Sequence, residues 1–410
     1  MGLPHVWQRG NLRLEPVEPR PRARSEAGVV GMMLTSIGPE VAVAATYRSA
    51  ATVLPYDNPS PTGYPSVMRA LAIDGYGLDH VALREVDDPT AGPGEVVVDV
   101  RAAALNHLDL WTLSGDLGIP HEFPHTLGAD GAGVIAAVGE DVTRLKPGLE
   151  VVVNPGLSCG ACEFCRAGEQ SACTSFRMLG EHSPGTFAEK VKVPAANVFP
   201  FPEHLSFVQA AALGTTAITA YRMLFGRGGL RPGEWVLITG IGGGLAVSLF
   251  QLARGVAGRV FVTSSSDAKL AKALELGADG SVNYKDEDAG KRLRAMTGKR
   301  GMDLVCDSAG GPALDQALRA LRKGGRVVVA GATAGAKAEI DLRRVFWNQL
   351  SIVGSTMGSH SEVADMLRAV AGMKLEPIID RSFSFEDGVE ALTYLESQDQ
   401  FGKVVLDLGA

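Results

Sequence analysis

An apolar run that ends in a cluster of glycines constrains the fold of this 410-residue chain more than any other feature. Residues 235–238 read Trp-Val-Leu-Ile, and four glycines follow within five positions: Gly240, Gly242, Gly243 and Gly244. A strand, a glycine turn and a helix start together form a phosphate-binding site, because the backbone N–H groups can approach a pyrophosphate without a Cβ in the way. The spacing departs from strict G-x-G-x-x-G, with Ala246 at the last small position. The sequence therefore predicts a dinucleotide-binding turn here.

The region around this turn alternates between strand-like and helix-like segments. Apolar, β-branched runs cover Trp235–Thr239, Arg259–Thr263, Asp303–Cys306 and Arg326–Ala330. Helical patterns lie between them, at Leu245–Val256, Lys269–Leu276 and Pro312–Leu321. Such alternation is typical of βαβ units, so we predict an α/β fold with a Rossmann-type, doubly wound parallel sheet over residues 217–350.

The segments before and after this region follow other patterns. From Met68, short β-rich runs recur between turn residues, at Val96–Val100, Gly133–Val138, Val151–Val153 and Phe187–Val193, which favours a Greek-key, barrel-like domain over residues 67–216. Residues 351–410 predict a strand, amphipathic helices near 362–373 and 385–395, and a last strand at 403–408. Residues 1–66 show no steady periodicity, so we expect a poorly ordered N-terminal extension.

Composition excludes several classes of protein. The formal net charge is −7, which argues against a nucleic-acid partner held by bulk charge. No uninterrupted apolar run reaches the ~18 residues that a membrane span needs. With 46% apolar residues the chain is ordinary for a globular protein, which excludes a largely disordered chain.

Four of the five cysteines fall within fifteen residues, as Cys159, Cys162, Cys165 and Cys173. Clustered cysteines at short spacing are typical of metal binding rather than of a disulfide framework. Four thiolates complete a tetrahedral zinc shell and leave no position open for substrate, so we predict a structural Zn²⁺. An iron–sulfur cluster is the alternative. Cys306 stands apart and is expected to be a core residue.

The end of the second strand of the parallel sheet bears on the choice between the two nicotinamide cofactors. An NAD site usually places a carboxylate there to bind the ribose hydroxyls, whereas this chain has Ser264 and Ser265, with Lys269 nearby. Hydroxyls and an ammonium group would receive a 2′-phosphate, so we predict NADPH. Two alternatives stay open: Asp267 could serve NAD, and the serines could simply cap the next helix.

Together these features resemble the medium-chain dehydrogenase/reductase superfamily over roughly residues 68–410. The resemblance rests on the cysteine cluster, on Leu127-Gly-Ala-Asp-Gly-Ala-Gly-Val-Ile135, and on the glycine turn followed by Gln251-Leu-Ala253. It implies a GroES-like β-barrel domain on the substrate side, a Rossmann domain inserted before the C-terminal segment, and a nicotinamide in the cleft between them. It also favours a homodimer or homotetramer, and with it we expect a cytoplasmic enzyme that acts on a small-molecule substrate.

The departures from the family pattern concern the catalytic metal. Zinc alcohol dehydrogenases bind it with cysteine, histidine and a second cysteine or acidic residue, but the equivalent positions here resemble Asn106, Ala129 and Thr215. Leu108 also replaces the hydroxyl residue that relays the alcohol proton. The resemblance therefore points to the zinc-less quinone oxidoreductase branch.

The resemblance also implies residues that bind the cofactor. His107 and Lys403 resemble pyrophosphate-facing residues, Thr219 resembles a threonine beside the nicotinamide, and Gly331 resembles a carboxamide-facing turn. Tyr284 resembles a residue that flanks the adenosine phosphate. For His107, Tyr284 and Lys403, an ordinary structural or surface role is the alternative.

A metal-free site suits some hydride acceptors better than others. Hydride addition to a simple carbonyl builds an alkoxide that needs strong stabilisation, whereas a quinone or an α,β-unsaturated carbonyl spreads the charge. Asn106 and Thr215 are candidate hydrogen-bond donors, and Asp109 could position them. We therefore predict an NADPH-dependent quinone or enone reductase. The alternatives are a zinc alcohol dehydrogenase with unusual ligands (His107, His125 or Asp130) and a non-catalytic NADPH-binding sensor.

Overall fold

The computed structural model describes residues 66–409, and the statements below concern that part of the chain. The extension expected over residues 1–66 lies outside it, apart from Ser66. None of the helices in residues 66–409 combines the length and the hydropathy that crossing a bilayer requires.

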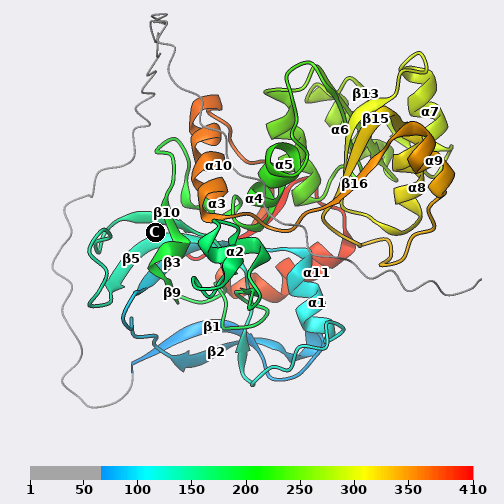
Figure 1. Cartoon of the computed structure of the whole chain (residues 1–410). Helices are drawn as coiled ribbons and strands as arrows, with labels where there is room; N and C mark the ends of the chain where they lie inside the picture. Colours follow the sequence, from blue (N-terminus) through cyan, green and yellow to red (C-terminus); the bar gives the residue numbers. More distant parts are fainter. Residues whose placement is uncertain (1–65, 410) are drawn as a thin grey trace, which may run out of the picture. The chain divides into compact units, whose positions relative to one another are not determined.

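A six-stranded parallel sheet forms the C-terminal α/β region (Figure 1). Its strand order is β13-β12-β11-β14-β15-β16. In chain order the strands are β11 (Trp235–Ile238), β12 (Arg259–Ser264), β13 (Gly280–Asn283), β14 (Met302–Asp307), β15 (Leu321–Val329) and β16 (Ser351–Gly354). The four predicted strands are all present. β16 pairs with β15, so the sheet runs past the boundary expected at residue 350.

Helices bury both faces of this sheet, which confirms the predicted α/β fold. The helices are α5 (Gly244–Arg254), α6 (Asp267–Glu275), α7 (Ala289–Met296), α8 (Gly311–Ala320) and α9 (Leu342–Asn348). One apolar cluster joins α5 residues such as Phe250 to Val236 and Ile238 of β11. A second cluster joins Leu293 of α7 and Leu318 of α8 to the sheet. Strands buried on both faces explain why these runs are uniformly apolar rather than alternating.

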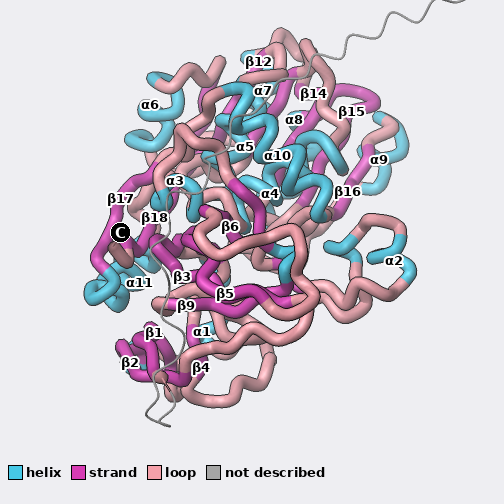
Figure 2. Tube along the Cα trace, turned by 90° about the vertical axis from the view of Figure 1, so that its left-hand side faces the viewer, coloured by secondary structure: helices cyan, strands magenta, loops and turns pink. Residues whose placement is uncertain are grey.

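The strands of the barrel region, which Figure 2 shows in magenta, pair antiparallel except for β17 with β18, in keeping with the predicted barrel-like domain. The largest sheet has the order β10-β6-β5-β3-β18-β17, with β9 also paired to β3. Its strands are β3 (Glu95–Ala104), β5 (Asp130–Val138), β6 (Glu150–Val153), β9 (Lys190–Pro194), β10 (Val198–Pro200), β17 (Ile379–Ser384) and β18 (Lys403–Asp407). Smaller sheets contain β1 (Val67–Ile73), β2 (Val81–Asp87) and β4 (His125–Thr126), and β7 (Gly156–Leu157) with β8 (Arg177–Met178). β18 brings the C-terminal segment back to β3, antiparallel to it.

Several predicted boundaries are wrong by a few residues, and two of them have a clear structural reason. The run expected as a strand from Phe187 becomes regular only at Lys190, because Phe187 instead bonds two separate backbones: its N–H donates to Leu127 and its carbonyl accepts from Leu71. The helix expected from Phe385 begins at Gly388, as α11 (Gly388–Ser397), after a single 3₁₀ turn. Phe385 itself is 2% exposed and packs in the barrel core.

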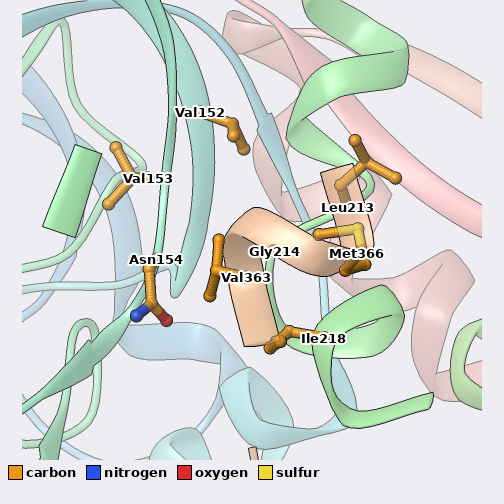
Figure 3. Close-up of a pocket in the computed structure, with 8 residues that line it drawn as sticks. All are labelled: Val152, Val153, Asn154, Leu213, Gly214, Ile218, Val363 and Met366. Carbon is orange, nitrogen blue, oxygen red and sulfur yellow. The ribbon is translucent and has the colours of Figure 1, made fainter. Parts of the chain in front are cut away.

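The remaining helices lie against the barrel sheet or between it and the α/β region. They are α1 (His107–Ser114), α2 (Glu163–Arg166), α3 (Phe207–Ala211), α4 (Thr215–Tyr221) and α10 (His360–Met373). Ile218 of α4 and Val363 of α10 belong to one apolar cluster with Val152 of β6. A cavity of about 10 Å³ remains between them, beside Met366, and is too small for more than a single water (Figure 3). α4 and α10 are therefore closely packed.

Candidate active site and metal centre

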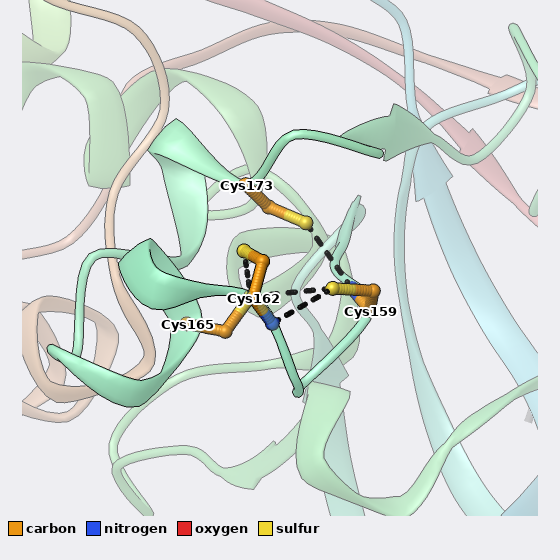
Figure 4. A group of neighbouring side chains, drawn as sticks. All are labelled: Cys159, Cys162, Cys165 and Cys173. Atoms are coloured by element: carbon orange, nitrogen blue, oxygen red, sulfur yellow. Dashed lines mark hydrogen bonds between the residues drawn. The ribbon is translucent and has the colours of Figure 1, made fainter.

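The four cysteines of the cluster converge on one point (Figure 4). Their sulfur atoms lie within 4.8 Å of one another, with 3.5 Å between the Sγ atoms of Cys162 and Cys165 and 4.0 Å between those of Cys159 and Cys165. A tetrahedral zinc with bonds of about 2.3 Å would place its sulfurs about 3.8 Å apart. These four residues therefore fit a closed tetrahedral metal shell.

Backbone groups around the sulfurs favour thiolates. The N–H of Cys162 donates to the Sγ of Cys159, and the N–H groups of Cys159 and Ser175 donate to that of Cys173. Hydrogen bonds from the backbone of Cys165 and Thr174 lower the pKa of Cys162 to about 6. Burial raises the pKa of Cys165 to about 11, so metal binding would release that proton.

The glycine turn lies at the carboxyl edge of the parallel sheet, between β11 and α5. Gly240 and Gly242 have φ angles of 67° and 128°, which other residues rarely adopt. A Cβ on Gly242 would lie 2.5 Å from the Lys269 side chain, and one on Gly244 would lie 2.7 Å from that of Lys403. Gly243 is the N-cap of α5, whose first N–H groups and positive dipole end suit a phosphate.

Several predicted cofactor residues share this edge. Ser264 ends β12, its carbonyl accepts from the N–H of Tyr284, and Gly331 follows β15. A Cβ on Gly331 would meet the Ser308 carbonyl at 2.5 Å, so only glycine fits there. Thr219 is 6% exposed on α4, and its hydroxyl faces the sulfur of Met357 at 3.7 Å.

The loop after β12 is already occupied by its own hydrogen bonds. The side chain of Ser266 caps α6 by accepting from the N–H of Lys269, and the hydroxyl of Ser264 accepts from the N–H of Ser266. The Lys269 ammonium donates to the Gln398 carbonyl at 2.5 Å, and burial lowers its pKa. Asp267 accepts from the Asn283 side chain at 2.8 Å.

Two of the candidate catalytic residues, Asn106 and Thr215, converge on the carboxylate of Asp130, which the sequence predicted only as an alternative metal ligand. It is fully buried at the start of β5. Its Oδ1 accepts from the backbone N–H and the hydroxyl of Thr215, at 2.6 and 2.7 Å. Its Oδ2 accepts from Asn106 Nδ2 at 2.9 Å and from Lys403 Nζ at 3.1 Å. Asp130 thus joins the barrel, α4 and the last strand.

The Lys403 ammonium is buried within this cluster. Lys403 is 4% exposed, and its Nζ also donates to the Leu105 carbonyl and to Asn106 Oδ1, both at 2.7 Å. Its stem passes Gly244 at the glycine turn, while its charged end reaches the Asn106 position. The predicted pyrophosphate contact of Lys403 stays a prediction. In the sequence, the only indication of the contact between Lys403 and Asp130 is a lysine at the start of a β-rich run.

Asp109 supports the same cluster from α1. Its Oδ2 accepts from the Asn106 N–H at 2.7 Å, and the two residues form a capping box at the start of the helix. Asp109 is 2% exposed, and burial raises its pKa to about 7. His107, the first residue of α1, is half-buried, and burial lowers its pKa. Its ring packs edge-on against Trp111, with 4.9 Å between the centroids.

The residues of the alternative zinc site do not gather. His125 Nε2 donates to the Gly180 carbonyl at 3.0 Å, and Asp130 is engaged by Lys403. Among residues 66–409, the four cysteines are the only group of three or more potential ligands within reach of one ion.

A parallel sheet with a glycine turn at its carboxyl edge is the arrangement with which Rossmann-type proteins bind dinucleotides, and here it is joined to a barrel with a four-cysteine loop. Residues 92–203 match the family model for the alcohol dehydrogenase GroES-like domain, and residues 242–372 match that for zinc-binding dehydrogenases. The chain belongs to the zinc-binding dehydrogenase family of the medium-chain dehydrogenase/reductase superfamily.

Three known proteins illustrate the range of this family. A zinc-type alcohol dehydrogenase-like protein, YogA, from Leptosphaeria maculans is 34% identical over 80% of this chain and 94% of its own. An acryloyl-coenzyme A reductase from Metallosphaera sedula is 30% identical over 83% and 99%. The crystal structure of an NAD-dependent alcohol dehydrogenase has a TM-score of 0.79 and 43% identity, and covers 83% of this chain and 100% of its own.

The buried ion pair predicts a strongly asymmetric mutational response. Lys403→Met should lower the free energy of unfolding by about 3 kcal/mol or more, because the Asp130 carboxylate would stay buried without its cation. The double variant Lys403→Met/Asp130→Asn should cost about 1–3 kcal/mol less than the sum of the single variants. Chemical denaturation measures both, with the exposed Lys323→Met as control. Additive costs would contradict a direct interaction.

The raised pKa of Asp109 predicts a pH-dependent stability. Between about pH 4, the unfolded value, and pH 7, the folded chain holds a proton that the unfolded chain has lost, so stability falls as the pH rises. Asp109→Asn cannot titrate, and its melting temperature relative to the wild type should therefore rise from pH 5 to pH 8. Thermal unfolding across this range measures the difference. A constant difference would show that Asp109 ionises normally.

Proposed function

We propose that this protein is an NADPH-dependent reductase that transfers hydride to a quinone or an α,β-unsaturated carbonyl compound without a catalytic metal. The observation that carries the proposal is the mutual satisfaction of the polar groups around Asp130. NADPH supplies the hydride when bound, and the chain's part is to place the acceptor against it.

The donors around Asp130 have no proton left for a substrate oxygen in this conformation. Both Nδ2 protons of Asn106 are used, by Asp130 and by the Ala104 carbonyl at 3.3 Å. The single hydroxyl proton of Thr215 goes to Asp130, and the three protons of Lys403 go to three oxygens. An alkoxide would find little stabilisation here, whereas an enolate or hydroquinone anion spreads its own charge. The geometry therefore favours a conjugated acceptor.

The side chains at the positions expected for a catalytic zinc also support a reaction without a catalytic metal. An amide, a methyl group and a hydroxyl stand at Asn106, Ala129 and Thr215, and zinc sites in proteins use thiolates, imidazoles and carboxylates. The nearby carboxylate of Asp130 already holds an ammonium group. We assign the one zinc of the proposal to the cysteine cluster. The acryloyl-coenzyme A reductase among the relatives indicates by its name that this fold can serve a conjugated thioester.

The preference for NADPH rests on the loop after β12. Ser264, Ser265 and Lys269 offer hydroxyls and an ammonium group near the ribose position, with no carboxylate at the end of the strand. Because Ser264 and Ser266 already bond within the loop, Ser265 and Lys269 carry most of this expectation, and Lys269 would exchange the Gln398 carbonyl for a phosphate. Because a similar solved structure is that of an NAD-dependent enzyme, the test has to compare NADPH with NADH.

We also propose that the protein forms a dimer through the edge of its parallel sheet. β16 is the last strand of that sheet and carries no charge or proline in Ser351–Gly354, so its free edge is open to pairing. The helix before it exposes large apolar side chains: Leu342, Phe346 and Trp347 are 70%, 65% and 74% exposed. A second copy of the chain would cover both features.

The proposed activity predicts rapid NADPH oxidation with p-benzoquinone, 9,10-phenanthrenequinone or simple enones, and about one zinc per chain. We expect kcat/KM for NADPH to exceed that for NADH by about tenfold, because the 2′-phosphate gains charge-assisted hydrogen bonds. Absorbance at 340 nm and metal analysis measure these quantities. Activity confined to simple alcohols, lost on chelation and restored by zinc, would refute the proposal. Tight NADPH binding without turnover of any acceptor would favour the alternative of a non-catalytic NADPH-binding sensor.

The proposed dimer predicts that Trp347→Glu yields a monomer, because a charge would be buried at the interface. Light scattering after size-exclusion chromatography measures the mass. Leu274→Glu on α6, a residue 45% exposed on a helix that packs on β13 and β12 at the opposite end of the sheet from β16, is the matched control and should leave the mass unchanged. A wild-type monomer at micromolar concentration would contradict the proposed interface.

A further inference from the structure

Two residues of the cysteine loop that are not candidate metal ligands contact the helices next to the candidate active site. Glu169 and Gln170 lie between Cys165 and Cys173, so a metal bound by the cysteines would order the segment that holds them. Glu169 forms an ion pair with Arg222 at 2.6 Å. The Gln170 side chain accepts from the backbone N–H of His360, the first residue of α10, at 3.3 Å.

Arg222 is the meeting point of three elements. It directly follows α4 and begins a π-helical turn, Arg222–Gly226. Its side chain is 9% exposed, and the guanidinium forms a second ion pair, with Glu362 at 2.5 Å. Glu362 also accepts from the Ser359 N–H in the capping box of α10. One buried cation thus links the end of α4, the start of α10 and the cysteine loop.

The opposite end of α4 is anchored in the candidate active site. Thr215, its first residue, makes two hydrogen bonds to Asp130. Residues seven positions apart lie on the same side of an α-helix, about 10 Å apart along its axis. Asp130 at one end and the two carboxylates around Arg222 at the other therefore fix the axial position of α4.

We propose that Arg222 is a positioning residue through which the metal-ordered cysteine loop sets the place of Thr215 against Asp130. The proposal rests on the proposed function only in that this contact is taken as part of the active site. When the loop is ordered, Glu169 balances part of the buried charge of Arg222. When the loop relaxes, Arg222 keeps only Glu362, and the end of α4 moves to find water or another partner.

The test measures hydrogen–deuterium exchange in α4 of the full-length protein with its zinc bound. Glu169→Gln preserves every cysteine and should raise the exchange rate of residues 215–221 about fivefold, because one anchor of the helix is weakened. Glu163→Gln is the matched control: it removes the same charge from an exposed position in the same loop. It should leave α4 exchange unchanged. Metal analysis verifies that both variants hold zinc.

Removal of zinc completes the cycle. Chelation of the wild type should raise α4 exchange to about the level of zinc-bound Glu169→Gln, and chelation of that variant should add less than about twofold more. The proposal would be overturned if the exchange rate of α4 changed neither on substitution of Glu169 nor on removal of zinc from the wild type. It would also be overturned if chelation raised α4 exchange by the same factor in the wild type and in Glu169→Gln. Because exchange needs no substrate, a failure of the proposed reductase activity would leave this result intact.

Kinetics with the active acceptor separates positioning from simple loss of structure. Arg222→Gln and Glu169→Gln should lower kcat several-fold with less than about twofold change in the dissociation constant of NADPH, because the contact they disturb is that of Thr215 with Asp130 in the candidate active site. Arg222→Lys keeps the charge and should recover part of kcat. Equal losses in cofactor binding and kcat, without recovery by lysine, would indicate general destabilisation and overturn the assignment.

Discussion

The ion pair between Asp130 and Lys403 is the interaction on which the candidate site depends. A carboxylate with no exposed surface is stable only when its hydrogen-bonding capacity is filled, and here four hydrogen bonds from three segments fill it. Those segments are the end of β3 with Asn106, the start of α4 with Thr215, and the start of β18 with Lys403. The antiparallel pairing of β18 with β3 brings the lysine within reach. The buried charge therefore sets how these parts of the chain meet.

The same ion pair decides which chemistry the site can support. A zinc ion accepts an electron pair from a substrate oxygen and so stabilises an alkoxide directly. The Lys403 ammonium holds one charge, donates all its protons to protein oxygens and is 4% exposed, so it stabilises Asp130 rather than a substrate. An acceptor that distributes the added charge over its own conjugated system needs the least stabilisation from such a site. This is the physical link between the geometry and the proposed quinone or enone substrate.

The parts of this structure that sequence predicts are those built from neighbours along the chain. The glycine turn, the βαβ units and the cysteine cluster each depend on short-range spacing, and the predicted strands and the convergent sulfur atoms followed from it. The Asp130 cluster is different: Thr215 lies 85 residues from Asp130, and Lys403 lies 297 residues from Asn106. No periodicity or spacing records such contacts. The sequence identified Asn106, Asp109 and Thr215 as candidates, but not that Asn106 and Thr215 bind the same carboxylate, Asp130.

A closed cysteine site is usually explained as a clamp for its own loop, but the contacts of this loop extend further. Glu169 reaches Arg222 and Gln170 reaches α10, so order in the loop is passed to both helices that flank the apolar cluster around Ile218 and Val363. Because the cavity there has a volume of only about 10 Å³, α4 and α10 cannot shift independently without opening empty space. A displacement at Arg222 must therefore move α4 as a unit or break its hydrogen bonds to Asp130. Because Thr215 supplies two of the four hydrogen bonds to Asp130, a small movement of Thr215 would leave this carboxylate short of a partner. Under the proposal, a metal held by the cysteines would therefore be coupled through α4 to the contact between Thr215 and Asp130.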